Sequence, residues 1–316
     1  MSEDNLPNRL ALLIIGVAGW VLAPVSHRGY WRVCRQVAAR LPNESVGIDL
    51  SLGGASRMKV LLNDPYWSRL VSPFYRYEPE LLNILRRSEE LDYAFLDCGA
   101  NFGYWSILVS DPEGLNRPTA AIEASPRTFK ILIENADLNG NRFPCLNNAI
   151  AGESGRLVRI IDRGDHAAAK IGAQSDPYAI APAVETLTIA DAVRRVFSKR
   201  LHGRAKPLPR RLVVKLDVEG HEIPALQGSA GFLFQERDTL LYYEDQRKDR
   251  KSRVTDFVLN TLGLKVFFVR GDRDPIPIVE VEMANNLKER RQPYGYNFFA
   301  CRQDSAFYAH LAGTRR

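Results

Sequence analysis

The stretch YAFLDCGANFGYWSILVS, residues 93–110, decides the fold class. An apolar run ends at Asp97, and a short turn with Gly99 and Gly103 leads into a second apolar run. This order predicts a strand, a turn and a helix N-terminus, the arrangement in which open α/β sheets bind nucleotides. The dinucleotide fingerprint G-x-G-x-x-G would require a middle glycine where Asn101 stands. The turn is therefore predicted to hold a different nucleoside.

The acid in this turn favours a ligand that carries a positive charge. Asp97 precedes the first glycine, and its carboxylate would repel a pyrophosphate. S-adenosylmethionine has a sulfonium, an ammonium and no phosphate. Gly99 lacks the Cβ that would block a ligand, and Gly103 lets the next helix approach the strand. We expect a cationic nucleoside such as S-adenosylmethionine at this turn; a structural turn without a ligand is the alternative.

A second acid lies 20 residues after Gly103 in the sequence, at the end of the next predicted strand. Glu123 is placed there to accept hydrogen bonds from both ribose hydroxyls of a nucleoside. Pro126 then opens a helix. The alternative is that Glu123 only neighbours the helix N-terminus, where an acid is favourable.

The rest of the chain indicates an α/β fold. Its 316 residues, 45% hydrophobic and 25% charged, have the composition of an ordinary globular protein. From residue 93, short apolar runs alternate with helical segments, which predicts a mostly parallel sheet with helices on both faces. Strands are expected near 93–97, 119–123, 144–150, 212–217, 240–244, 264–269 and 297–301. Helices are expected near 101–110, 126–139, 188–201, 222–235 and 251–262. An extra antiparallel pair is expected near 156–162 and 183–187.

The segment RLVVKLDVEGHEIPALQG, residues 211–228, brings acids to the same sheet edge. Its strand ends at Asp217, and Glu219, His221 and Glu222 follow on the turn into a helix. We expect catalytic groups here: His221 as general base, because its ordinary pKa is about 6.5, then Asp217, with Glu219 beside them. The alternative is that these acids fill the favourable first turn of a helix.

A strand in TLLYYEDQRKD ends at Glu244 and Asp245. If that strand neighbours Asp217, the three carboxylates could hold Mg²⁺, which would orient an acceptor hydroxyl and lower its pKa. The alternative is two surface acids paired with Arg247 and Lys248.

Residues 1–90 are expected to be helical and irregular. An apolar run from Leu10 to Val25 is 16 residues long, short of the roughly 20 that a spanning helix needs. A basic, aromatic segment follows, with Arg28 and Trp31 among its residues. One interpretation is an interfacial anchor that contacts an anionic membrane through residues 10–40. The other is a helical cap packed on the catalytic domain.

Charge and cysteine content limit the other partners. The net charge is +6, and the four cysteines form no C-x-x-C motif, so neither a disulfide framework nor a zinc site is expected. A cytoplasmic protein fits, at the inner membrane face if it is anchored. Residues 194–211 hold eight Lys or Arg and no acid, which suits an acidic acceptor or a solvated loop. Phe197 is the one aromatic residue there, which disfavours nucleic acid.

With these motifs in sequence order, the chain resembles the FkbM family of S-adenosylmethionine-dependent methyltransferases. The family pattern is D-x-G-A-N-x-G, then E-x-x-P, then K-x-D-x-E-G-x-E. The matching segments are residues 97–103, 123–126 and 215–222, and the resemblance covers about residues 90–302.

The resemblance implies a Rossmann-like class I sheet of seven strands with the last antiparallel, in a domain over residues 91–302. It leaves a helical extension over 1–90 and a tail over 303–316. It implies O-methylation of a hydroxyl on a sugar, glycan or secondary metabolite, with the active-site edge at Asp217. It also implies that Asp97, Gly99, Asn101, Gly103 and Glu123 bind S-adenosylmethionine. The metal-binding pattern is also similar, more loosely, to metal-dependent sugar O-methyltransferases. A nucleic-acid methyltransferase and a non-catalytic, membrane-attached protein with the same fold are the alternatives.

Overall fold

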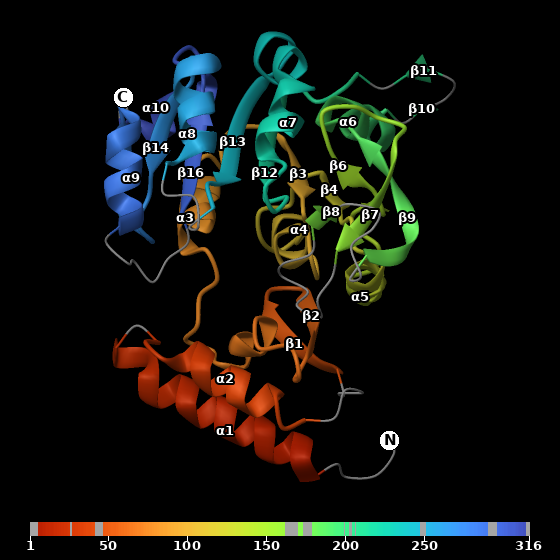
Figure 1. Cartoon of the computed structure of the whole chain (residues 1–316), viewed down its shortest axis with the longest axis vertical. Helices are drawn as coiled ribbons and strands as arrows, with labels where there is room; N and C mark the ends of the chain where they lie inside the picture. Colours follow the sequence, from red (N-terminus) through yellow and green to blue (C-terminus); the bar gives the residue numbers. More distant parts are fainter. Residues whose placement is uncertain are drawn as a thin grey trace.

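An eight-stranded sheet forms the centre of the computed structural model (Figure 1). The structure describes residues 6–25, 27–41, 47–161, 170–172, 179–198, 200–201, 204–205, 207–246, 251–289 and 296–313. In spatial order the strands are β15 (Ile276–Ile278), β14 (Lys265–Phe268), β16 (Asn297–Cys301), β13 (Asp238–Glu244), β12 (Arg211–Leu216), β3 (Ala94–Cys98), β4 (Thr119–Ile122) and β5 (Cys145–Leu146). Strands β5, β4, β3, β12 and β13 are parallel, and β16 is antiparallel to both neighbours. The predicted Rossmann-like class I fold is confirmed.

The sheet departs from the prediction at both edges. The eighth strand, β15, was not predicted; its central Pro277 lacks an N–H, which an edge strand tolerates. The strand expected over 144–150 divides into β5, in the main sheet, and β6 (Ala149–Ile150), in a second sheet. The second sheet has the order β6, β9 (Ala179–Leu187), β7 (Leu157–Ile161) and β8 (Lys170–Gly172). Its antiparallel pair of β7 and β9 confirms the pair expected near 156–162 and 183–187.

The predicted helices are present, and four of them are shorter than expected. The helices of the sheet region are α3 (Pro79–Arg87), α4 (Tyr104–Val109), α5 (Pro126–Leu138), α6 (Ile189–Phe197), α7 (Glu222–Gln227), α8 (Arg253–Asp256), α9 (Val281–Glu289) and α10 (Ala306–Leu311). The four shorter helices are α4, α6, α7 and α8. Helix α4 begins only after Gly103, whose φ of +87° is left-handed. Helix α6 ends at Phe197, and the basic segment continues into the short hairpin of β10 (Arg200–Leu201) and β11 (Arg204–Ala205). Separate π-helical turns follow α7, over Phe232–Glu236, and α8, over Phe257–Thr261.

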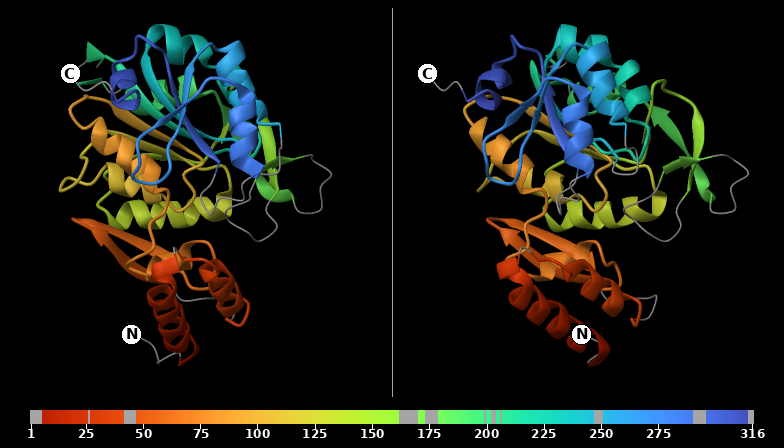
Figure 2. Two further views of the ribbon diagram at one scale, coloured as in Figure 1. Left: turned by 90° about the vertical axis from the view of Figure 1, so that its left-hand side faces the viewer. Right: turned by 60° about the vertical axis from the view of Figure 1, so that its left-hand side comes forward.

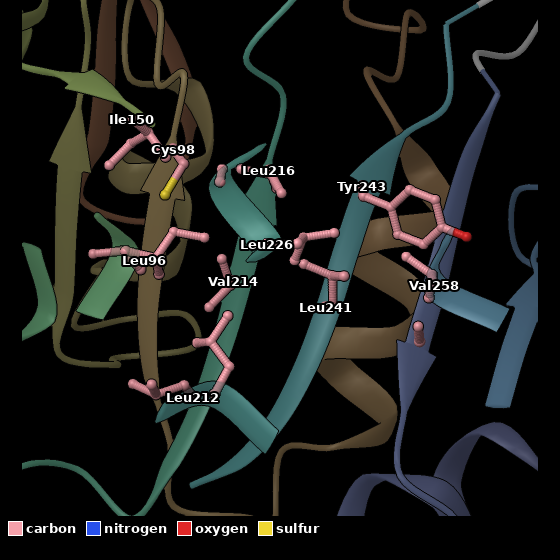
Figure 3. Close-up of a cluster of buried hydrophobic side chains, with 14 of the residues drawn as sticks. Leu96, Cys98, Ile150, Leu212, Val214, Leu216, Leu226, Leu241, Tyr243 and Val258 are labelled. Atoms are coloured by element: carbon pink, nitrogen blue, oxygen red, sulfur yellow. The ribbon is translucent and has the colours of Figure 1, made fainter. Parts of the chain in front are cut away.

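Side chains alternate between two apolar layers on the faces of the sheet. Leu212, Val214 and Leu216 face one layer together with Leu226 of α7 (Figure 3). Val213, between them in sequence, faces the other layer, which α3, α4 and α10 cover. Both faces of these strands are thus buried, as is usual for parallel strands. The alternation places Lys215 on the same face as Val213, which matters for the site below.

The N-terminal region packs below the sheet in Figures 1 and 2 and contains more than helices. Helices α1 (Leu6–Leu22) and α2 (Tyr30–Ala38) pack beside an antiparallel hairpin of β1 (Gly47–Gly53) and β2 (Ser56–Leu61) and the 3-10 turn Trp67–Val71. The expectation of a helical and irregular region was wrong for this hairpin. Amide side chains of α5 tie it to the sheet region: the backbone N–H of Lys59 donates to Asn135 Oδ1 at 2.6 Å. By length and composition alone, one described helix, over residues 6–25, could cross a membrane.

Candidate functional site

A cleft of about 1410 Å³ lies at the carboxyl ends of the parallel strands. This is the sheet edge at which open α/β sheets bind ligands. Strand ends supply the polar residues at its base, which are Asp97, Glu123, Lys215, Asp217 and Glu244. The N-terminal region supplies the opposite wall, including Tyr66, Trp67, Tyr77 and Glu78. The cleft therefore brings together the sequence motifs and a region that no motif marked.

The glycine turn is shaped by the approach of two loops. Gly99 has a φ of +81°, and a Cβ on it would lie 1.8 Å from the carbonyl oxygen of Asp217. Glycine is needed there because the β3 and β12 turns meet, and Gly99 also lines the cleft. A Cβ on Gly103 would lie 2.7 Å from Leu132 Cδ1, so glycine at this position allows α5 to pack closely against the turn. Both glycines shape the site without offering a side chain to it.

Glu123 fixes the turn to the end of β4. Its Oε2 accepts the backbone N–H of Asn101 at 2.9 Å, and its Oε1 accepts the backbone N–H of Ser125 at 2.7 Å. The side-chain oxygen of Asn101 accepts Trp67 Nε1–H at 2.8 Å. Burial raises the pKa of Glu123 to about 7, although its two backbone hydrogen bonds oppose the shift. A carboxylate has about four acceptor positions, so these two hydrogen bonds leave Glu123 with capacity to accept from a ligand.

Lys215 and Asp97 lie side by side below the turn, because they pair in register across β12 and β3. Lys215 is 3% exposed, and its Nζ lies 3.0 Å from Asp217 Oδ2. Burial disfavours the ammonium, but the carboxylates of Asp217, Glu78 and Asp97 outweigh it and hold the Lys215 pKa well above its usual range. We predicted no role for Lys215 from the sequence, although a lysine inside an apolar strand is itself a signal.

One oxygen of Asp97 has no hydrogen-bond partner among the described residues. Ser106 Oγ donates to its Oδ2 at 2.7 Å, whereas its Oδ1 is buried without a hydrogen-bond donor among the residues that the structure describes. Burial raises the pKa of Asp97. A buried acceptor with unused capacity is costly unless a ligand satisfies it, and a ligand ammonium would do so.

Glu78 is a site residue that the sequence analysis missed. It has a left-handed φ of +43° just before α3. Trp105 Nε1–H donates to its Oε2 at 2.5 Å, and Asn297 Nδ2–H donates to its Oε1 at 3.2 Å. Burial raises its pKa to about 7, with the charges of Glu80 and Asp217 adding to the rise and Lys215 opposing it. Nothing local in the sequence around Glu78 indicates a contact with residues so distant in the chain.

Three carboxylates converge beside Lys215. Oxygens of Asp217, Glu219 and Glu244 all lie within 4.8 Å of one another. Glu219 has a left-handed φ of +51°, and Glu222 supports its turn by accepting the backbone N–H of Gly220 at 3.1 Å. Burial, and then the charges of Asp217 and Glu219, raise the pKa of Glu244 well above its usual range. The trio can take up a proton, or it can hold a hard divalent cation.

The structure corrects the predicted metal set and places the predicted base elsewhere. Asp245 points to the opposite sheet face, where Lys288 Nζ lies 2.7 Å from its Oδ1 and Thr255 Oγ1 donates to its Oδ2 at 2.6 Å. Adjacent strand residues alternate between faces, so Glu244 reaches the cleft and Asp245 cannot. His221 is half-buried at the start of α7 and is not among the residues that line the cleft. Arg247 and Lys248 lie outside the described residues.

The strand order and the acids at the strand ends define a Rossmann-like methyltransferase domain. Residues 97–268, more than half of the chain, match the family described as "Methyltransferase FkbM domain". The chain belongs to this family, which implies S-adenosylmethionine as its methyl donor. No curated protein matches the chain.

Solved structures of methyltransferases show distant likeness. The FkbM methyltransferase from Methylobacillus flagellatus KT has 12% identity and a TM-score of 0.38 over 88% of this chain and 60% of that one. The precorrin-6y C5,15-methyltransferase from Geobacter metallireducens GS-15 has 13% identity and a TM-score of 0.35 over 69% and 84%. TYW2 from M. jannaschii in complex with AdoMet has 14% identity and a TM-score of 0.37 over 82% and 86%. This chain thus spans three fifths of the M. flagellatus chain.

Proposed function

We propose that this protein transfers a methyl group from S-adenosylmethionine to a hydroxyl of an acidic sugar, glycan or secondary metabolite. The observation that carries the proposal is one cleft in which Asp97 and Glu123 lie beside the carboxylate trio of Asp217, Glu219 and Glu244. The first two acids suit a cationic nucleoside, and the trio suits the removal of a proton.

The cofactor roles follow from the unused acceptors of the site. Asp97 Oδ1 accepts a hydrogen bond from the methionyl ammonium, and the spare acceptor positions of Glu123 take the ribose hydroxyls. Asn101 holds the turn between them through its bonds to Glu123 and Trp67. Lys215 keeps the neighbouring acids from repelling one another.

The opposite wall suits a sugar with negative charge. Tyr66 and Tyr77 share a hydrogen bond of 2.8 Å between their hydroxyls, next to the ring of Trp67. Aromatic faces beside carboxylates are typical surroundings for a sugar ring, whose C–H groups pack on the ring and whose hydroxyls bond to the acids. Arginines also line the cleft, and they favour an acidic acceptor: Arg28, Arg32, Arg69, Arg76, Arg270 and Arg273.

The reaction is an in-line displacement. The acceptor oxygen attacks the methyl carbon, a C–O bond forms, and the C–S bond breaks with its electron pair returning to sulfur. The site contributes chiefly by holding the oxygen within about 3 Å of the methyl carbon. The hydroxyl proton passes to the trio, where Glu244 has the raised pKa that a proton acceptor needs.

Mg²⁺ is a second way to balance the charge of the trio. Asp217, Glu219 and Glu244 would hold the ion. Asp217 Oδ2 already contacts Lys215 Nζ at 3.0 Å. A bound Mg²⁺ would lower the pKa of the acceptor hydroxyl.

The proposal is tested by Asp217→Asn with Asp245→Asn as its matched control. With radiolabelled S-adenosylmethionine and a panel of acidic and neutral glycans, Asp217→Asn should lower kcat by about 10²- to 10⁴-fold, the range of general acid–base catalysis. Calorimetry should show that the variant still binds the cofactor. Asp245→Asn, on the other sheet face, should keep kcat per folded molecule.

Three results would replace the proposal. Near-normal turnover by Asp217→Asn would remove the trio from the reaction. Label transferred to RNA rather than to any glycan would indicate a nucleic-acid methyltransferase. Failure of the wild-type chain to bind S-adenosylmethionine would indicate a non-catalytic protein. Parallel assays with a chelator and with added Mg²⁺ decide whether the trio uses the ion.

A further inference from the structure

Helix α1 presents an apolar face that nothing in the described chain covers. Trp20 is 67% exposed and Leu13 is 63% exposed. The other exposed apolar residues of the helix are Leu6, Leu10, Ile14, Val17 and Val21. A continuous exposed stripe of this kind marks an interaction surface.

The opposite face of α1 is fixed to the protein. Ile15 is fully buried in a cluster with Tyr30 and Cys34 of α2. A Cβ on Gly19 would lie 2.4 Å from Ser72 Cβ, so the helix packs closely on the segment that follows the Trp67–Val71 turn. A spanning helix would contact lipid around most of its circumference, whereas α1 has one packed face and one open face. This geometry suits a helix that lies in the plane of a membrane surface.

Charge identifies the partner of this surface. Residues 6–41 hold five arginines and no acidic residue. Four of the arginines follow α1 and are exposed: Arg28, Arg32, Arg35 and Arg40. The guanidinium of Arg35 lies 5.3 Å from the ring centre of Trp31, which is itself 43% exposed. Basic and aromatic side chains beside an apolar stripe are the combination that binds anionic lipid surfaces.

We propose that the exposed faces of α1 and α2, which we call the lipid-facing surface, bind an anionic lipid bilayer. The cleft reaches this surface: Ala23, Arg28 and Arg32 line the cleft, as does Phe74, which is 53% exposed. A smaller apolar hollow of about 370 Å³ at the end of α1 shares Ala23 and Phe74. The acceptor therefore reaches the site from the bilayer as an anionic, lipid-linked molecule, a consequence that rests on the proposed function.

The four tryptophans of the chain provide a direct test. Trp20 and Trp31 lie on the lipid-facing surface, whereas Trp67 and Trp105 are 3% and 2% exposed. Vesicles of phosphatidylcholine with brominated phosphatidylglycerol should quench the fluorescence of the full chain. The quenching should fall in Trp20→Phe and Trp31→Phe and nearly vanish in the double variant. Unchanged quenching in the double variant would overturn the proposal.

Charge and apolar variants test the two parts of the surface. Arg28→Glu with Arg32→Glu and Arg35→Glu should weaken vesicle sedimentation on the order of 100-fold, because each basic residue near an anionic surface contributes a several-fold factor. The matched control is Arg194→Glu with Arg195→Glu and Lys265→Glu, exposed residues of α6 and β14 far from the lipid-facing surface (Figure 1). Leu13→Glu should also abolish sedimentation, whereas Leu157→Glu, at a residue 75% exposed on β7, should not.

Other occupants of the surface would give different results. Equal binding to pure phosphatidylcholine vesicles at all salt concentrations would remove the anionic requirement, and protein that resists alkaline carbonate would indicate a spanning helix. A lipid-independent dimer that Leu13→Glu dissociates would indicate a second copy of the chain. Each of these outcomes overturns the proposal. Cofactor binding is measured without vesicles, so loss of cofactor binding with intact vesicle binding contradicts the proposed function alone.

Discussion

Two buried lysine–aspartate pairs lie on opposite faces of the same sheet, and their surroundings differ. In the Lys288–Asp245 pair, Asp245 is fully buried and also accepts the backbone N–H and the hydroxyl of Thr255, at 2.9 and 2.6 Å. In the Lys215–Asp217 pair, the atoms are 3.0 Å apart, and the Asp217 side chain is 25% exposed to the cleft. The first pair is closed, whereas the second is open to a ligand.

The charge balance of the two pairs separates structure from function. Lys288 Nζ lies 2.7 Å from Asp245 Oδ1 and donates to the carbonyl oxygen of Gln246 at 3.3 Å. Lys215 is surrounded by Asp217, Glu78 and Asp97, and burial raises the pKa of the last two. An excess of buried acid over base disfavours folding, so its presence in a cleft indicates a ligand or a reaction that uses it. We infer that the closed pair stabilises the fold and the open pair serves the chemistry.

The largest loss of stability is expected from a substitution that breaks the closed Lys288–Asp245 pair. Lys288→Met leaves the Asp245 carboxylate buried without its cation, which should lower the free energy of unfolding by about 3–5 kcal/mol. Urea unfolding followed by circular dichroism measures this change. Lys288→Met with Asp245→Asn should recover part of the loss, because no charge is then left unpaired. A single variant with an unchanged urea midpoint would show that the pair contributes little.

The same lysine-to-methionine substitution in the open Lys215–Asp217 pair should cause a loss of stability that depends on pH. Burial raises the pKa of Asp97 and Glu78, and the Lys215 ammonium opposes that rise, so in Lys215→Met these acids take up protons more readily. The loss of stability should therefore be small at pH 5 and larger at pH 8, where the acids must ionise without their cation. Equal losses at both pH values would contradict the distinction between the two pairs.

The contrast between Glu244 and Asp245 also shows what the sequence could predict. Motif order located the strand ends at Asp97, Glu123 and Asp217, because local apolar runs determine where strands end. The prediction grouped Glu244 with Asp245, although the period of two in a strand sends neighbours to opposite faces. That error was avoidable from the sequence. The convergence of Glu219 on Glu244 depends on loop geometry, including the left-handed φ of Glu219, which no spacing rule supplies.

The N-terminal region also has one feature that the sequence could predict and one that it could not. The hairpin of β1 and β2 has a visible signal, since Ile48, Leu50 and Leu52 alternate with polar residues before the turn at Gly53 and Gly54. This alternation of apolar and polar residues is the pattern of a half-buried strand, so the hairpin could have been predicted. The role of Glu78 had no such signal. Its contacts, Trp105 and Asn297, are 27 and 219 residues away in the chain, so only the fold reveals them.

A smaller effect, on cofactor affinity, is expected from a substitution of Glu123, which lines the same cleft as the open Lys215–Asp217 pair. Glu123→Gln keeps the shape of the side chain but removes its charge and replaces one acceptor oxygen with a donor. The affinity for S-adenosylmethionine should fall about 10- to 100-fold, because hydrogen bonds to a charged group contribute about 1.5–3 kcal/mol. Calorimetry measures the affinity, and Glu134→Gln, at a half-exposed carboxylate of α5, is the control. Wild-type affinity in Glu123→Gln would remove Glu123 from the cofactor site.

The smallest expected effect is a proton released when the cofactor binds to the open site. Because burial raises the pKa of Glu123 to about 7, about half of the protein molecules carry a proton on Glu123 at pH 7. Ribose hydroxyls that donate to the carboxylate favour its charged form, so binding should lower this pKa and release up to about half a proton. The affinity should accordingly rise about twofold from pH 7 to pH 8, since less of the free protein must then lose a proton. Calorimetry at pH 7 in buffers with different ionisation enthalpies counts the protons released.

Glu78, whose pKa is also about 7, lines the same cleft, so proton release must be compared between Glu78→Gln and Glu123→Gln. Release that persists in Glu123→Gln and disappears in Glu78→Gln would assign the proton to the acceptor side of the cleft instead.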